Sequence, residues 1–312
     1  EVREVGPFAD ANLKFMKDAP ALSFQDYIGM NIMFQNSKAD GYDKFYVKAV
    51  QVTSNGIKVS ETECRTVDYT SNGVNYTIFE HPVMEWDMTD VVTLTLYAEK
   101  DGVVYVGQSI TASVASRALE MLESYEGKEG KDLNRTTLVD MLNYGAALQV
   151  NQGHNVDSLP SAGDYAKYGT VDAPELTATT SKTGDGTAFL KGPAISMQAK
   201  VEFNFMVMTA ELTGRTVKVF CDDVELEDAV VFQDYNETYK YVRIAIKASE
   251  MRNTYTIALY DDVTGEAVSL VITTSVEALC LQNINKGKNV DLANALMCYG
   301  DSVAAYAASL AQ

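Results

Sequence analysis

The sequence predicts an α+β protein made of two tandem repeats, each an antiparallel β-sandwich-like domain closed by a C-terminal helical hairpin. Two observations lead to this fold class. Blocks of the first half of the chain recur in the same order in the second half, and within each half strand patterns are followed by helical patterns. Because strands and helices do not alternate along the chain, a parallel sheet of βαβ units is disfavoured.

The internal repeat rests on four pairs of matching blocks. Residues 20–25 read PALSFQ and residues 193–198 read PAISMQ, an offset of 173 positions (193 minus 20). Three further pairs match: 94–97 with 257–260, 113–114 with 275–276, and 141–145 with 296–300. The offset falls steadily to 155 (296 minus 141), as expected when loops shorten while packed elements keep their length.

Length and composition fit two globular domains. The chain has 312 residues, enough for two cores, and its apolar fraction is 46%. We divide it into a first module of residues 1–150, a connecting segment of residues 151–186 and a second module of residues 187–312. The connecting segment is rich in Gly, Ser and Thr and long for a linker, so we expect part of it to lie along a domain surface.

Strands are predicted where β-branched and aromatic residues cluster between turn formers. In the first module these segments are residues 28–34, 45–52, 75–79 and 91–97. In the second module they are residues 201–208, 216–221, 239–246, 255–260 and 267–273. Asn55-Gly56 and Asn72-Gly73 are typical of hairpin turns, because both residue types tolerate positive φ.

Each module then changes to helical spacing. Apolar residues recur every three or four positions over 114–122 and 138–148, and again over 276–284 and 292–304. Gly145 and Gly300 lie inside the second helix of each module, where glycine costs about 1 kcal/mol relative to alanine. Glycine at these matched positions predicts that a neighbouring backbone approaches closely.

The charge balance disfavours two classes of partner. Asp and Glu number 43 against 25 Lys and Arg, a net charge of −18, which repels nucleic acid and anionic membrane surfaces. No apolar run is long enough for a membrane span, and we expect a monomer. The four cysteines are too few and scattered for a disulfide framework, although a bridge between Cys280 and Cys298 stays open.

The sequence offers little catalytic chemistry. His81 and His154 are the two histidines, they are not at matched positions, and neither belongs to a nucleophile motif. We therefore predict no enzyme activity, no catalytic residues and no cofactor. The acidic turns at 40–43 and 261–266 leave calcium open as an alternative to simple solvated turns.

The best candidate for ligand binding is the predicted strand 239–246. Every second residue from position 242 is aliphatic, which leaves Tyr239, Tyr241 and Arg243 on the opposite face, with Tyr235 extending the stripe. Such a stripe of rings with a hydrogen-bonding Arg suits a sugar ligand. The alternative is ordinary cross-strand packing, or a face covered by the helices.

Trp86, the single tryptophan, is also tempting as a sugar-binding residue. Glu85-Trp86 aligns with Glu250-Met251 of the second module, so the position is apolar in both repeats. We therefore expect Trp86 to belong to the core.

Residues 142–147, which read LNYGAA, resemble a repeat module found in large secreted and cell-surface multidomain proteins of gut Firmicutes. In that module a β-rich segment ends in a Leu-Tyr pair, echoed here at 96–97 and 259–260. The second repeat departs from the pattern, with Cys298 in place of Asn and Asp301-Ser302 in place of small residues. The resemblance implies an extracellular, cell-surface setting, in some cases with polysaccharide use, and assigns no binding or catalytic residue.

These observations predict a non-catalytic extracellular region that binds a polysaccharide or a surface protein, in adhesion or polysaccharide capture. An architectural spacer without a ligand of its own is the alternative, and a glycan-active hydrolase comes third.

Overall fold

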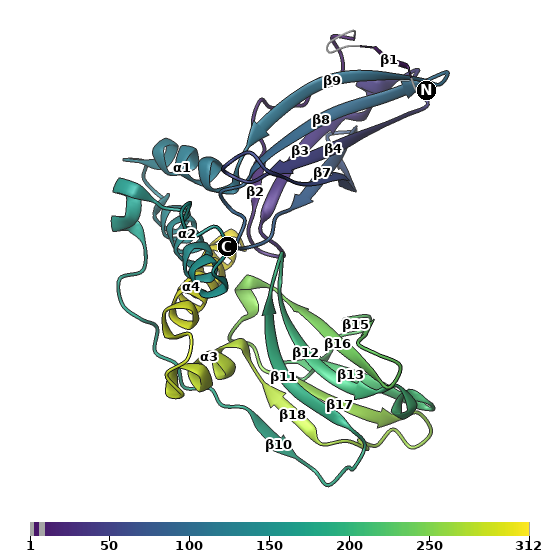
Figure 1. The fold of residues 1–312 in the computed structure, drawn as a ribbon, viewed down its shortest axis with the longest axis vertical. Helices are drawn as coiled ribbons and strands as arrows, with labels where there is room; N and C mark the ends of the chain where they lie inside the picture. The colour runs from purple at the N-terminus through teal and green to yellow at the C-terminus, as the bar shows by residue number, and fades with distance from the viewer. Residues whose placement is uncertain (1–2, 6–9, 312) are drawn as a thin grey trace.

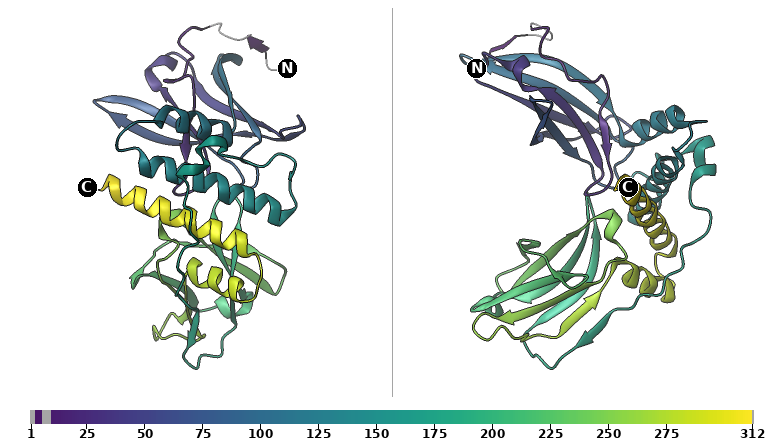
Figure 2. Two further views of the ribbon diagram at one scale, coloured as in Figure 1. Left: turned by 90° about the vertical axis from the view of Figure 1, so that its left-hand side faces the viewer. Right: turned by 180° about the vertical axis from the view of Figure 1, so that it is seen from behind.

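The computed structural model describes residues 3–5 and 10–311, which form two β-sandwiches joined through four α-helices (Figure 1). Each sandwich packs a four-stranded sheet against a five-stranded one. The helices gather on one side of the molecule, and the sandwiches diverge from them to give a V shape (Figures 1 and 2). The predicted α+β class with mostly antiparallel sheets is confirmed.

The first sandwich precedes the first helix. Its four-stranded sheet has the order β2 (Ala21–Ser23), β3 (Gly29–Gln35), β7 (Val74–Pro82) and β6 (Arg65–Ser71). The opposing sheet has the order β1 (Arg3–Val5), β9 (Val103–Ala112), β8 (Val91–Lys100), β4 (Lys44–Val52) and β5 (Lys58–Glu63). Neighbours pair antiparallel, except that β1 is parallel to β9.

The second sandwich has the same strand order. Its four-stranded sheet runs β11 (Leu190–Met197), β12 (Val201–Met208), β16 (Tyr239–Ile246) and β15 (Val230–Asp234). Its five-stranded sheet runs β10 (Ser181–Thr183), β18 (Val271–Thr274), β17 (Tyr255–Asp261), β13 (Arg215–Cys221) and β14 (Val224–Glu225). One difference is that β10 pairs antiparallel with β18, whereas β1 is parallel to β9.

The sandwich cores follow from the period-two pattern of the strands. In β12, the side chains of Val201, Phe203, Phe205 and Val207 are buried, while those between them are half-buried. β8 alternates in the same way, and its apolar set packs between the two sheets of the first sandwich. The inward face of each sheet therefore makes the core, and the outward face of the four-stranded sheets is left for other contacts.

The helices are α1 (Val114–Tyr125), α2 (Asp132–Gln152), α3 (Val276–Asn285) and α4 (Val290–Leu310). In each half a serine between the last strand and the first helix is the N-cap residue of that helix. The Ser113 hydroxyl accepts a hydrogen bond from the Ser116 backbone N–H, and the Ser275 hydroxyl accepts one from the Ala278 N–H. These serines belong to the matched blocks 113–114 and 275–276.

α2 and α4 pack side by side and join the two halves of the molecule (Figure 2). At their contact the buried rings of Tyr144 and Tyr299 stack with centroids 5.4 Å apart and planes 8° from parallel. The Tyr144 hydroxyl donates to the Glu85 carboxylate group, and the Tyr299 hydroxyl donates to the Phe24 carbonyl. A ring stack with both hydroxyls satisfied is compatible with complete burial.

Two methionines and two backbone carbonyls lie against the helix glycines, and one of the methionines corrects the placement of Trp86. A Cβ at Gly145 would lie 2.5 Å from the Met88 Sδ, and one at Gly300 would lie 2.7 Å from the Met251 Sδ. The predicted close approach of a neighbouring backbone is also present, because the Glu85 and Ala248 carbonyl oxygens lie 3.3 Å from these two Cβ positions. Met88, and not Trp86, occupies the place of Met251, so the predicted alignment of Trp86 was wrong. Trp86 is half-buried at the edge of the core.

The loops beside this helix pair exchange equivalent hydrogen bonds. The Glu85 N–H donates to the Gln198 carbonyl at 2.7 Å, and the Ala248 N–H donates to the Gln25 carbonyl at 2.9 Å. Gln25 and Gln198 are matched residues of the blocks 20–25 and 193–198. Residues 85 and 248 are likewise separated by the 163 positions of the neighbouring blocks. Each half therefore offers the other the same donor and the same acceptor.

The segment between the halves is anchored along the helices. Thr170 donates to the buried Asp140 carboxylate of α2 through its N–H at 2.8 Å and its hydroxyl at 2.6 Å. Further on, the Thr177 N–H donates to Glu277 of α3 at 2.7 Å. These contacts tie the segment to both halves.

All four cysteines are free thiols, so Cys280 and Cys298 are not bridged. Burial raises the pKa of Cys64 and of Cys280 to about 12, which keeps both as unreactive thiols. Within the described part of the chain, no helix combines the length and the apolar character needed to cross a bilayer.

Candidate functional site

The strand β16 carries three of the four predicted ligand-binding residues on one face of the second sandwich, and the fourth, Tyr235, lies in the turn before it. Val242, Ile244 and Ile246 are buried toward the core, and Tyr239, Tyr241 and Arg243 lie half-buried on the outward face. Tyr235 follows β15 and is 56% exposed. The helices do not cover this face, because the four-stranded sheets face the open side of the V (Figure 1).

The aromatic rings on this face pack in two groups rather than in one row. Tyr235 and Tyr241 meet edge to face, with centroids 5.1 Å apart. Tyr239 instead packs on Phe189, with centroids 5.5 Å apart and planes inclined by 52°. The predicted stripe is therefore a Tyr235–Tyr241 pair beside a Tyr239–Phe189 pair.

Arg243 is held by its own sheet. One Nη pairs with the Glu202 carboxylate of β12, and the other donates to the Gln233 Oε1 of β15 at 2.9 Å. Its Nε is buried and has no hydrogen-bond partner among the described residues. These contacts of Arg243 are the cross-strand packing that was the alternative to ligand binding. They leave the Arg243 Nε as a donor without a partner among the described residues.

The first sandwich carries a tyrosine pair at the equivalent positions, which the sequence patterns did not reveal. Tyr76 pairs in register with Gln35, and Tyr239 pairs with Met208, which lies 173 positions after Gln35. Tyr69 stands opposite Tyr76, with ring centroids 6.1 Å apart, and is 46% exposed. Only the strand register shows that these tyrosines correspond to Tyr235 and Tyr239.

The two four-stranded sheets also carry matched asparagines on their outward faces. Asn31 of β3 accepts a hydrogen bond from the Tyr27 hydroxyl at 2.7 Å. Its counterpart Asn204 of β12 donates to the Ser196 hydroxyl at 2.8 Å. Each outward face therefore carries a hydrogen-bonded amide group in addition to its tyrosines.

Neither histidine lies on these faces. His81 is buried in the first sandwich, its Nε2 has no partner among the described residues, and burial lowers its pKa to about 4. His154 Nε2 lies 2.7 Å from the Asp87 carboxylate, a pair that the sequence did not predict. No serine or cysteine of the described chain is hydrogen-bonded to either imidazole ring.

Asp87 and His154 serve a structural contact. They bring the chain after α2 against the loop before β8, where Gln51 also donates to Asp90 at 2.8 Å. Burial raises the pKa of both aspartates, although the hydrogen bond from His154 opposes the shift at Asp87. The Trp86 ring borders this cluster, 6.4 Å from that of His154.

The acidic turns bind their own backbone. The Asp261 carboxylate accepts the N–H groups of Val263 and Thr264, both at 2.9 Å, and these bonds lower its pKa. Asp43 likewise accepts the Asp101 N–H at 3.0 Å. Among residues 10–311, no group of three or more His, Cys, Asp or Glu side chains is arranged to hold a metal ion.

Neither the scan against protein-family models nor the search of the curated proteins finds a match to this chain. The outward faces of the two four-stranded sheets present two kinds of chemical group. Tyrosine rings offer flat apolar surfaces with a hydroxyl, and the flanking amides and ion pairs offer donors and acceptors. Such a surface is chemically complementary to a ligand that is polar at its edges and apolar on its faces.

Proposed function

We propose that the chain is a non-catalytic cell-surface region that binds polysaccharide through the outward faces of its two four-stranded sheets. The recurrence of tyrosines on the outward faces supports this most directly, since Tyr69 and Tyr76 on one sheet correspond to Tyr235 and Tyr239 on the other, and one member of each pair, Tyr69 or Tyr235, is exposed. An exposed ring adds little to a core, so recurrence at such positions favours a role at the surface.

The chemistry of a sugar fits these faces. A pyranose ring has an apolar face that stacks on a tyrosine and hydroxyls that bond to amide, carboxylate and guanidinium groups. Arg243 with Glu202 and Gln233 supplies all three kinds of group beside Tyr241. The extracellular setting rests on the resemblance of the LNYGAA segment to modules of secreted surface proteins.

We also propose that the chain arose by tandem duplication. The ordered sequence blocks and the identical strand order of the two sandwiches support this, as does the exchange of equivalent hydrogen bonds at the joint. Under this proposal each half contributes one ligand-binding face.

An architectural spacer is the second proposal, and the joint between the halves favours it. Tyr144 and Tyr299 are fully buried between α2 and α4, and such a contact suits a rigid element that holds other domains apart. A spacer binds no polysaccharide, so the two proposals differ in a measurable way.

Affinity gel electrophoresis tests the binding proposal. Starch, mucin and plant polysaccharides are cast into native gels, and the wild-type protein should be retarded by at least one of them. The paired variants Tyr239→Ala/Tyr241→Ala and Tyr69→Ala/Tyr76→Ala should each weaken this retardation. Base–aromatic stacking, a comparable ring contact, is worth about 1–3 kcal/mol per ring, which indicates a loss of roughly tenfold or more in affinity.

Tyr260→Ala is the matched control, because Tyr260 is half-buried on the five-stranded sheet of the same sandwich. It should leave retardation unchanged. If no polysaccharide retards the wild-type protein, the spacer is favoured. Release of reducing ends from any of these substrates would instead establish a hydrolase.

A further inference from the structure

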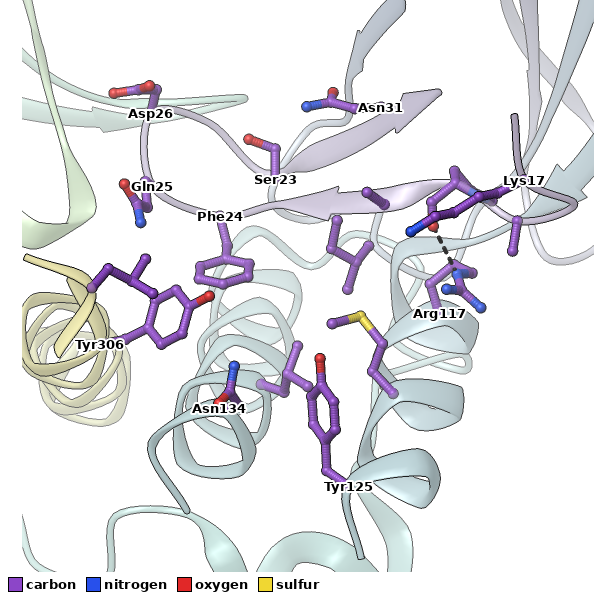
Figure 3. Close-up of a pocket in the computed structure, with 17 residues that line it drawn as sticks. Lys17, Ser23, Phe24, Gln25, Asp26, Asn31, Arg117, Tyr125, Asn134 and Tyr306 are labelled. Atoms are coloured by element: carbon purple, nitrogen blue, oxygen red, sulfur yellow. Dashed lines mark hydrogen bonds between the residues drawn. The ribbon is translucent and has the colours of Figure 1, made fainter. Parts of the chain in front are cut away.

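A further cavity of the described chain lies away from the tyrosine faces. It has a volume of about 510 Å³ and is lined on one side by residues 19–26, eight consecutive positions that include β2. Its other walls come from three helices, with Arg117 and Met121 of α1, Leu138 of α2 and Tyr306 of α4 (Figure 3). We call this cavity the β2 groove. A cavity that follows one extended segment has the shape of a second extended chain.

The backbone of β2 is open toward this groove. β2 is an edge strand that pairs only with β3 in its sheet. The Pro20 carbonyl points away from β3, because it accepts a hydrogen bond from the Arg117 Nε of α1 at 3.0 Å. Alternate residues of a strand direct their N–H and C=O groups to the same side, so those of Leu22 also face the groove. The Phe24 carbonyl, on the same side, accepts from the Tyr299 hydroxyl, so Leu22 is the residue of this edge that offers its N–H and C=O to another strand.

An equivalent groove exists in the second half. A cavity of about 280 Å³ is lined by Pro193, Ala194, Ile195 and Met197 of β11 together with α3 and α4. The six-residue blocks 20–25 and 193–198, the best match between the two halves, thus supply one wall of each groove. The proposed glycan faces do not account for this match, since Leu22 and Ile195 line the grooves.

The two ends of the β2 groove differ in the charge of the residues that line them. Lys17 and Arg117 lie at one end and Asp26 lies at the other (Figure 3). Arg117 is paired with Glu120, whereas Lys17 has no ion-pair partner among the described residues. Leu22, Met121 and Leu138 supply apolar surface between the two ends. In a chain of net charge −18, an unpaired cation at the end of an apolar groove complements an acidic group.

We propose that the β2 groove binds an extended peptide segment of a partner protein, which adds to β2 as an antiparallel strand. Antiparallel pairing places the C-terminal end of that segment beside Lys17 and Arg117, so that end carries an acidic residue. Its alternate side chains are apolar and pack on Leu22, Met121 and Leu138. Main-chain hydrogen bonds to Leu22 provide affinity without sequence preference, and the charge and apolar contacts provide specificity.

A displayed library of random 12-residue peptides, panned on the full chain, tests this proposal. The expected consensus alternates apolar residues and ends in Glu or Asp. A synthetic peptide of that consensus is then measured by fluorescence anisotropy. N-methylation of the one peptide nitrogen that faces the Leu22 carbonyl should abolish binding, while N-methylation at the two adjacent positions should not.

Charge reversal supplies the second arm. Lys17→Glu should weaken the acidic-ended peptide by about threefold to tenfold, and replacement of the terminal Glu of the peptide by Lys should recover that loss. Lys182→Glu, on the exposed strand β10, is the matched control and should change nothing.

The proposal is overturned if no selected peptide depends on Lys17, if N-methylation has no positional effect, or if a soluble glycan rather than a peptide occupies the groove. Tyr239→Ala/Tyr241→Ala should leave peptide binding intact. Failure of glycan binding and failure of peptide binding are therefore separate outcomes.

Discussion

At the scale of single residues, two buried ionisable groups make stability depend on pH in opposite directions. Glu85 is 2% exposed at the joint between the halves, and burial raises its pKa to about 8, with the Tyr144 hydrogen bond opposing the shift. His81 is 6% exposed in the first sandwich, and burial lowers its pKa to about 4. The counterparts of these residues in the second half are Ala248 and Ile244, neither of which titrates.

Glu85→Gln should remove an alkaline loss of stability. The folded pKa of Glu85, about 8, lies above the unfolded value near 4.5. Its contribution to the stability of the folded state is therefore fully present below pH 4.5 and is lost as pH rises toward 8. The loss is at most about 5 kcal/mol. Urea unfolding at pH 5, 7 and 9 measures it. A Gln variant that keeps the wild-type slope would contradict the assignment to Glu85.

His81→Ile should remove an acidic loss of stability. The folded pKa of about 4 lies below the ordinary 6.5, so stability is fully present above pH 6.5 and falls as pH drops toward 4. The loss is at most about 3 kcal/mol. Thermal unfolding at pH 4.5 and 7 checks this, with His154→Ala as the control for the exposed imidazole. An Ile variant as acid-sensitive as the wild type would refute it.

At the scale of elements, strand prediction succeeded where apolar residues alternate and failed where they do not. The bounds of β12 and β16 are those predicted, because both strands bury one face in a core. β6 was missed since nearly all of its side chains are exposed, so no alternation marks it. Asn72-Gly73 does form the predicted turn, with positive φ at both residues.

Tertiary packing limits what the sequence can show at this scale. Trp86 was placed in the slot of Met251 by a local Glu-plus-apolar match, whereas the slot is defined by the approach of α2 to Met88. The alternation of apolar residues in β16 was enough to predict that Tyr239, Tyr241 and Arg243 lie on its outward face. Tyr69, Tyr76 and the β2 groove were not predicted, because they depend on strand register and helix placement.

The close packing of Met88 on Gly145 predicts that a larger residue at position 145 lowers stability. Gly145→Ala adds a Cβ at 2.5 Å from the Met88 Sδ, so we expect overpacking to cost about 1–3 kcal/mol despite the better helix propensity of alanine. Met88→Val in the same chain should recover part of the loss by shortening the opposing side chain. Chemical denaturation measures both, and an unchanged or higher stability of Gly145→Ala would contradict the fit.

At the scale of the whole molecule, the joint between α2 and α4 decides whether the sandwiches act as one body. It includes the Tyr144–Tyr299 stack, the two exchanged backbone hydrogen bonds and the hydrogen bond from the Thr137 hydroxyl to the Ser302 carbonyl. The connecting segment adds anchors on α2 and α3. These contacts predict a fixed angle between the sandwiches.

Removal of the ring stack should separate the halves. Tyr144→Ala/Tyr299→Ala leaves a large cavity at the joint, and a buried aromatic-to-alanine change costs about 3–5 kcal/mol per site. Calorimetry should show one unfolding transition for the wild type and two for the variant, and small-angle X-ray scattering should show a larger radius of gyration. A variant with one transition and an unchanged radius would mean that the remaining contacts suffice.

A joint assembled from like parts of one polypeptide differs from a dimer of identical subunits in how it responds to mutation. In a homodimer every substitution enters twice, once in each subunit, so both sides of the interface change together. Here the titratable Glu85 stands where the other half has Ala248, and Cys298 stands where the other half has Asn143. One arm of the V is therefore able to acquire new specificity while the other preserves the shape on which both depend.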